Sequence, residues 1–81
     1  MKIVLYYDAS VASTDARTFL EERNISFEAV DVQNQSGFQR LLKRTQQKYT
    51  PAFELKHSHN IFVIVGLNKE ILERELELHK K

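Results

Sequence analysis

Two histidines, His57 and His59, stand two positions apart, a spacing that could serve metal binding. Residues at this spacing in a strand project to the same face, so both imidazoles could reach one ion. Two ligands with no nearby carboxylate make a weak site. We therefore interpret the pair as part of a solvated turn and expect no metal.

Four basic residues gather in the middle of the chain: Arg40, Lys43, Arg44 and Lys48. We interpret them as a solvated basic face. The alternative is a surface for an anion or an acidic partner. The sequence shows no catalytic carboxylate pair, glycine-rich phosphate loop or nucleophile elbow.

Cysteine is absent from the 81 residues. This excludes disulfides, thiolate catalysis, iron–sulfur ligation and cysteine-based zinc sites within the chain. Any chemistry must come from hydroxyl, amide, carboxylate or basic groups.

Length and charge narrow the possibilities further. A chain of 81 residues predicts one domain spanning 1–81. The 12 basic and 11 acidic residues nearly cancel, which argues against a nucleic-acid or membrane-surface binder. The apolar start is too short for a signal peptide, and no stretch reaches membrane-span length. We expect a cytoplasmic protein, a monomer or weak dimer, with Leu78 a candidate dimer contact.

The sequence predicts seven helices and strands in all. Strands are predicted over 3–7, 26–32, 52–56 and 61–65, from β-branched and aromatic runs. The first is apolar throughout, which predicts a central strand buried on both faces. Helices are predicted from 10 to 23, from 36 to about 46 and after 68. The residues 57–60 form a hairpin turn, and the order is βαβαββα.

Helix ends are predicted from polar residues at the boundaries. Ser10 and Asn68 suit N-caps, and Ser36 with Gln39 fits a capping box. Asn24 suits a left-handed C-terminal cap, and His79 is a favourable cation at the end of the last helix. The predicted core is Ile3, Leu5, Phe19, Leu20, Val30, Leu41, Leu42, Phe62, Ile64, Leu72 and Leu76.

Three segments in this order resemble the glutaredoxin family of the thioredoxin fold. They are residues 25–32 (ISFEAVDV), 45–51 (TQQKYTP) and 65–72 (VGLNKEIL). The family has I-x-Y-E-x-x-D-V, T-G-Q-R-T-V-P and V-G-F-D-x-x-x-L at these places. The resemblance covers nearly the whole chain. It implies an α/β domain with a four-stranded mixed sheet, strand order 2-1-3-4, and helices on both faces.

The family's C-P-Y-C motif falls on Ser10-Val11-Ala12-Ser13. Glutaredoxin chemistry needs a low-pKa thiol at a helix N-terminus. A serine hydroxyl cannot form a mixed disulfide, so this chain has no thiol–disulfide oxidoreductase activity. Ser10 and Ser13 then remain as helix-capping hydroxyls, or as donors to the sulfur of a ligand.

Two accounts of the serines stay open. The chain is a natural, redox-inactive relative, or it is the Cys-to-Ser form of an active parent. Other departures favour the first account. Asp8 replaces the family's proline before the motif, Tyr7 replaces its lysine, and Leu67 interrupts its Gly-Gly pair.

The resemblance also implies a ligand site and a peptide bond. The bond before Pro51 is expected to be cis, close to Ser10, with the Thr50 backbone free for an extended peptide or protein partner, or for glutathione. The implied binding residues are Tyr7, Ser10, Ser13, Gln47, Thr50, Pro51, Gly66 and Asn68. We expect a non-redox module for a peptide or for a thiol compound such as glutathione, which would bind weakly. The alternatives are a glutaredoxin-type oxidoreductase seen without its thiols, or the N-terminal domain of a glutathione transferase.

Overall fold

The structure is a computed structural model that describes residues 2–78. Its elements are β1 (Lys2–Tyr7), α1 (Val11–Glu22), β2 (Glu28–Asp31), α2 (Gln35–Thr45), β3 (Ala52–Lys56), β4 (Ile61–Val65) and α3 (Lys69–Leu78). The βαβαββα order predicted from the sequence is confirmed. The predictions for His79 and for the Leu78 side chain lie outside the described parts of the chain. No described helix has the length and apolar character needed to cross a membrane.

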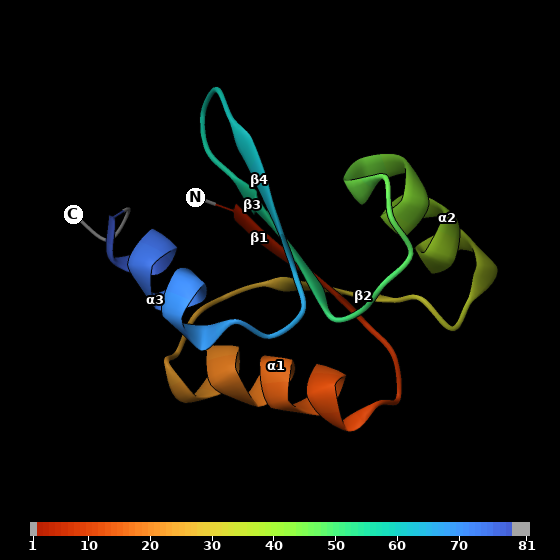
Figure 1. Cartoon of the computed structure of the whole chain (residues 1–81), viewed down its shortest axis with the longest axis horizontal. Helices are drawn as coiled ribbons and strands as arrows, with labels where there is room; N and C mark the ends of the chain where they lie inside the picture. The colour runs from red at the N-terminus through yellow and green to blue at the C-terminus, as the bar shows by residue number, and fades with distance from the viewer. Residues whose placement is uncertain (1, 79–81) are drawn as a thin grey trace.

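The four strands form one mixed sheet in the order β2-β1-β3-β4, as expected. β1 runs parallel to β2 and antiparallel to β3, and β4 returns antiparallel to β3. Helices α1 and α3 cover one face of the sheet and α2 covers the other (Figure 1). β1 is therefore central, and its carboxyl end points to the start of α1.

Central strand β1 is buried on both faces because its side chains alternate between two cores. Ile3 and Leu5 pack with Phe19 of α1 and Leu72 of α3. Val4 and Tyr6 pack on the other face in a smaller cluster with Leu41 of α2. β3 is also buried on both faces, which places three further residues in the core that the prediction omitted: Ala52, Phe53 and Leu55.

Two predicted core residues, Leu42 and Phe62, are exposed, at 40% and 45%. Leu41 takes the inward position on α2, and its neighbour Leu42 is rotated about 100° away. Phe62 lies on the edge strand β4, which has a strand neighbour on one side only among residues 2–78. Leu76 is half-buried against the larger cluster.

The helix caps are mostly where the sequence places them. Ser10 accepts from the Ser13 N–H, Asn68 accepts from the Ile71 N–H, and Asn24 is left-handed with φ of 54°. The Ser36 cap is wrong, because α2 begins earlier and Asn34 accepts from the Gly37 N–H at 2.9 Å.

Gly37 explains the close approach of this first turn to the sheet. A Cβ there would lie 1.9 Å from the Asp31 carbonyl oxygen, so a residue with a side chain does not fit. The second strand, β2, is also shorter than the predicted 26–32, since only Glu28–Asp31 pairs with β1.

Candidate functional site

The carboxylate of Asp8 joins three segments at the carboxyl end of β1. Its Oδ1 accepts from the Ser10 N–H at 2.9 Å and from the Ser13 hydroxyl at 2.9 Å. Its Oδ2 accepts from the Thr50 hydroxyl at 2.7 Å. We call Asp8, Ser10, Ser13 and Thr50 the Asp8 network. It connects the end of β1, the start of α1 and the loop before β3.

Local sequence explains why α1 begins at this network. Asp8 accepts from a backbone N–H two residues on, which forms an Asx-turn. Ser10 follows in an extended conformation and caps α1 by accepting from the Ser13 N–H at 3.2 Å. Ser13 is buried, and its hydroxyl also accepts from the Asp8 N–H at 3.1 Å.

The electrostatics of the network favour a charged carboxylate. Hydrogen bonds from Ser10, Thr50 and Ser13 hold the pKa of Asp8 well below its ordinary value of 3.8. Its position before the N-terminus of α1 favours the negative charge as well. A carboxylate with a lowered pKa is charged at neutral pH and is a weak general base there. What the network offers is hydrogen bonding.

The loop before β3 presents backbone groups beside this network. The Thr50–Pro51 peptide bond is cis. The carbonyl of the buried Pro51 accepts from the Gly66 N–H at 2.7 Å, and Gly66 has φ of +84°, a region that favours glycine. Within residues 2–78, the N–H and C=O of Thr50 make no hydrogen bond with another backbone group. The described backbone therefore leaves both groups without a backbone partner.

Two exposed apolar side chains are sequence neighbours of network residues. Val11, next to Ser10, is 77% exposed, and Tyr49, next to Thr50, is 64% exposed. They are the two most exposed large apolar side chains in the described part of the chain. Polar groups that can orient a ligand thus lie beside apolar groups that gain from contact with one.

The structure brings together some of the predicted site residues. Ser10, Ser13 and Thr50 meet through Asp8, and Pro51 contacts Gly66.

The remaining three predicted residues have partners elsewhere. The amide of Gln47 bonds within its own loop, to the Thr45 hydroxyl and the Tyr49 N–H. Asn68 caps α3. The Arg17 guanidinium lies over the Tyr7 ring, 4.4 Å from the ring centroid.

Asp8 is the residue that sequence reasoning missed. In the sequence, Asp8 is interpreted only as a departure from the family's proline. The position of Asp8 two residues before a serine N-cap could have indicated its bond to the start of α1, but not its bond to the distant Thr50.

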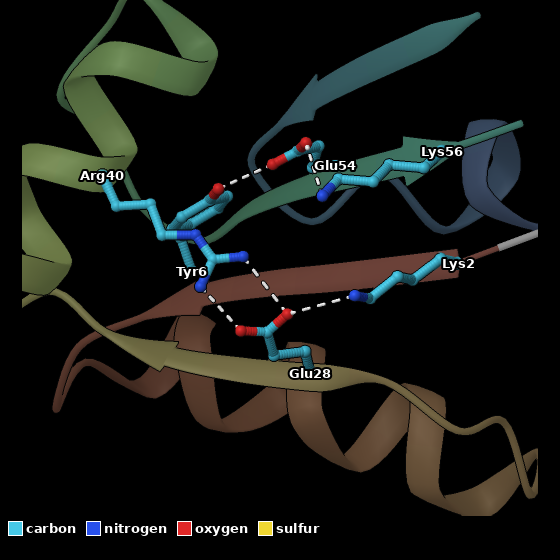
Figure 2. Close-up of polar contacts among 6 residues, drawn as sticks. All are labelled: Lys2, Tyr6, Glu28, Arg40, Glu54 and Lys56. Carbon is cyan, nitrogen blue, oxygen red and sulfur yellow. Dashed lines mark hydrogen bonds and ion pairs between the residues drawn. The ribbon is translucent and has the colours of Figure 1, made fainter. Parts of the chain in front are cut away.

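One of the four basic residues, Arg40, is held in an ion pair. The Arg40 guanidinium donates to both carboxylate oxygens of Glu28, at 2.6 and 3.2 Å, and Lys2 lies 3.8 Å from the same carboxylate. These pairs lower the pKa of Glu28. Lys43, Arg44 and Lys48 are exposed. The charge of Arg40 is thus already balanced (Figure 2).

A second polar cluster lies on the same face of the sheet as Arg40. The Tyr6 hydroxyl donates to Glu54 Oε1 at 2.6 Å, and Lys56 Nζ lies 3.6 Å from Glu54 Oε2 (Figure 2). Glu54 and Tyr6 are completely buried. Burial and the bond to Glu54 raise the pKa of Tyr6. The weak alternation of β3 had not indicated a buried acid.

The two histidines have different surroundings. The His57 ring packs against Phe62 with 5.4 Å between centroids, while His59 is exposed in the turn. Over residues 2–78 no three His, Asp or Glu side chains are grouped so that they could hold a metal.

Two solved structures share this architecture. A point mutant of the thioredoxin-like protein BC3987 superposes with a TM-score of 0.79 at 25% identity, over 93% of this chain and 99% of that one. Thioredoxin f2 of Chlamydomonas reinhardtii superposes with a TM-score of 0.65 at 19% identity, over 95% of this chain and 76% of that one. The chain has a thioredoxin-like fold. No protein-family model matches the sequence, and no curated protein matches it.

The Asp8 network has a defined position in this thioredoxin-like fold. In this chain the network lies where β1 meets α1, and no cysteine accompanies it. The predicted fold class is confirmed, including the strand order.

Proposed function

We propose that this thioredoxin-like protein is a non-redox binding module for an extended peptide segment of a partner protein. The observation that carries the proposal is the Thr50 backbone without a backbone partner, with Val11 and Tyr49 exposed next to Ser10 and Thr50 in the chain. An extended peptide could exchange main-chain hydrogen bonds with Thr50 and place apolar side chains on Val11 and Tyr49. A cytoplasmic location is part of this proposal.

Hydrogen bonding fixes the geometry of this surface before a ligand arrives. The Thr50 hydroxyl is tied to Asp8, which is tied in turn to the start of α1. A preformed site loses less conformational entropy on binding than a loop that must be ordered. The network thus supports a binding role although it contains no activated nucleophile.

Peptide binding is tested with a library of extended heptapeptides displayed on phage, followed by ¹⁵N NMR titration with an enriched peptide. We expect shifts at Ser10, Val11, Tyr49 and Thr50. The Val11→Ser/Tyr49→Ser variant should weaken binding about tenfold or more, since burying an apolar side chain contributes about 1.5–3 kcal/mol. Leu42→Ser, an exposed apolar position on α2, is the matched control. Failure to enrich any peptide, or shifts confined to another surface, would contradict the proposal.

Glutathione is a second candidate ligand, through the resemblance to glutaredoxins. Tyr7 and Leu67 replace a cationic residue and a glycine of that family, and Gln47 is engaged within its own loop. Losing one or two charge-assisted contacts costs about 10- to 10⁴-fold in affinity. We expect a dissociation constant above about 1 mM by calorimetry. A tighter value would mean that Ser10, Thr50 and Gly66 retain most of the family's affinity.

The alternative, a glutaredoxin-type oxidoreductase without its thiols, is favoured by one observation. Ser10 is exposed at a helix N-terminus, where an attacking thiolate would need to be. The protein itself should show no turnover in an insulin or mixed-disulfide assay. In Ser10→Cys/Ser13→Cys, the Asp8 carboxylate would disfavour a thiolate beside it. We expect slow exchange that accelerates in the same variant carrying Asp8→Asn. Rates typical of an oxidoreductase with Asp8 in place would support the alternative.

A further inference from the structure

The outer edge of the sheet is formed by β4, whose five residues are all apolar. Four of them are exposed: Ile61, Phe62, Val63 and Val65, at 54%, 45%, 38% and 47%. Edge strands of soluble proteins are usually protected by charged side chains, proline, a bulge or a covering element. In the described part of the chain, β4 has none of these on its open side.

The hydrogen bonds to β3 determine which backbone groups face outward. Gly66 N–H donates to the Pro51 carbonyl and His57 N–H donates to the Asn60 carbonyl. Because hydrogen-bonded residues alternate along an antiparallel pair, Phe62 and Ile64 also face β3. The N–H and C=O groups of Ile61, Val63 and Val65 therefore point to the open edge.

These three residues are complementary to a second copy of themselves. In an antiparallel pair centred on Val63, each Val63 lies opposite its counterpart, and each Ile61 lies opposite Val65 of the other copy. All three pairs can exchange both of their main-chain hydrogen bonds. No charged side chain of β4 is buried by this pairing, since the strand has none.

The side chains of β4 that line a groove beside α3 fit the same pairing. A groove of about 320 Å³ runs between β4 and α3, and its lining includes Phe62, Ile64, Val65 and the exposed Ile71. The antiparallel register places Phe62 of one copy opposite Ile64 of the other. The exposed Phe62 ring of each copy would then fill the groove of its neighbour.

We infer that two copies of this chain associate through antiparallel β4–β4 pairing centred on Val63, which makes one continuous eight-stranded sheet. The proposal does not rest on the proposed function. β4 and the groove residues Asn68, Ile71 and Glu75 together make eight residues per copy. Standard interfaces use about 20–30 per side, so the dimer is weak, with a dissociation constant of roughly 10 µM to 1 mM.

The absence of cysteine makes a register-specific test possible, because any introduced thiol is the only one. Hydrogen-bonded partners in an antiparallel pair have Cα atoms about 5.5 Å apart, within the range of about 4.4–6.8 Å that a disulfide needs. Val63→Cys should therefore form covalent dimers on mild oxidation. The matched control Val65→Cys should not, since its two copies lie four residues apart along the strand direction, about 14 Å.

Sedimentation equilibrium of the unmodified protein is the second measurement. We expect a monomer–dimer equilibrium that Val63→Lys shifts to monomer by tenfold or more, while Leu42→Lys on α2 leaves it unchanged. Circular dichroism verifies that each variant is folded. A monomer throughout at about 1 mM, or cross-linking that is equally fast in Val65→Cys and Val63→Cys, would overturn the proposal. Efficient cross-linking confined to Val63→Cys would support it even if Val63→Lys failed to fold.

Discussion

Two carboxylates, that of Asp8 directly after β1 and that of Glu54 within β3, are held in opposite ways. Asp8 is half-buried and accepts three hydrogen bonds, from Ser10, Ser13 and Thr50. Glu54 is completely buried but accepts one, from Tyr6, and its Oε2 has Lys56 at 3.6 Å without a hydrogen bond. The carboxylate nearer to solvent is thus the better satisfied of the two.

The two carboxylates therefore have different roles in the structure. The bonds to Asp8 join three chain segments and fix their relative geometry, on which the proposed peptide site depends. The bond to Glu54 instead relieves the cost of burying an acid in an apolar sheet, a cost that one hydrogen bond offsets in part. We expect the free energy of unfolding to be most sensitive to the surroundings of Glu54. The geometry of the surface at the start of α1 should depend on Asp8.

The largest effect on stability should come from Tyr6→Phe. This variant leaves the buried Glu54 without its hydrogen bond and should lower the free energy of unfolding by about 2–3 kcal/mol, measured by urea denaturation. Replacing both partners, in Tyr6→Phe/Glu54→Leu, should recover most of the loss, since an apolar pair leaves no unsatisfied acid. A double variant as unstable as the single one would show that Glu54 has a further role.

Next in size is the pH dependence that Asp8 confers. Because its pKa is lowered on folding, its contribution is fully present above the ordinary value of 3.8 and decreases as the pH falls from there through the lower pKa of the folded protein. Asp8→Asn should be less stable than the unmodified protein at pH 7, and the difference should be clearly smaller at pH 2. Denaturation at both pH values measures this. If the two proteins differ in their free energy of unfolding as much at pH 2 as at pH 7, Asp8 contributes through the shape of its side chain and not through its charge.

A smaller effect is expected from Thr50→Val, which removes one bond to Asp8 and preserves the shape of the side chain. We expect a loss of about 1 kcal/mol, together with altered NMR shifts at Ser10 across the network. Thr18→Val, at an exposed position on α1, is the control. If Ser10 is unaffected by Thr50→Val, the loop and the helix start are not coupled through Asp8.

The smallest change should follow Arg40→Lys. The ion pair with Glu28 is bidentate but partly exposed, with 33% and 39% of the two side chains accessible. A lysine cannot form the two-pronged contact, yet exposed ion pairs contribute only about 0–1 kcal/mol. We expect a loss below about 1 kcal/mol that shrinks in high salt. A larger loss would place Arg40 in the Tyr6–Glu54 cluster as a structural member.

Local sequence signals predicted most of the elements, and contacts between distant segments explain the failures. The strands, the hairpin and the caps at Ser10, Asn24 and Asn68 depend on neighbouring residues and were predicted. Glu54 was not, because its burial depends on Tyr6, which is 48 positions away. Asp8 was missed for a similar reason, since its bond to Thr50 spans 42 positions. No local pattern indicates which loop will face a turn residue.

The position of β1 in the middle of the sheet also bears on how the chain folds during synthesis. Leu5 pairs with Phe53 and Lys2 with Lys56, so the central strand acquires its antiparallel neighbour late. At about 5–20 residues per second, the ribosome needs roughly 2–10 s to make the chain between such partners. During that interval the apolar strand β1 lacks its antiparallel neighbour β3. We expect nascent chains truncated before β3 to depend on chaperones, and full-length chains to be released from them.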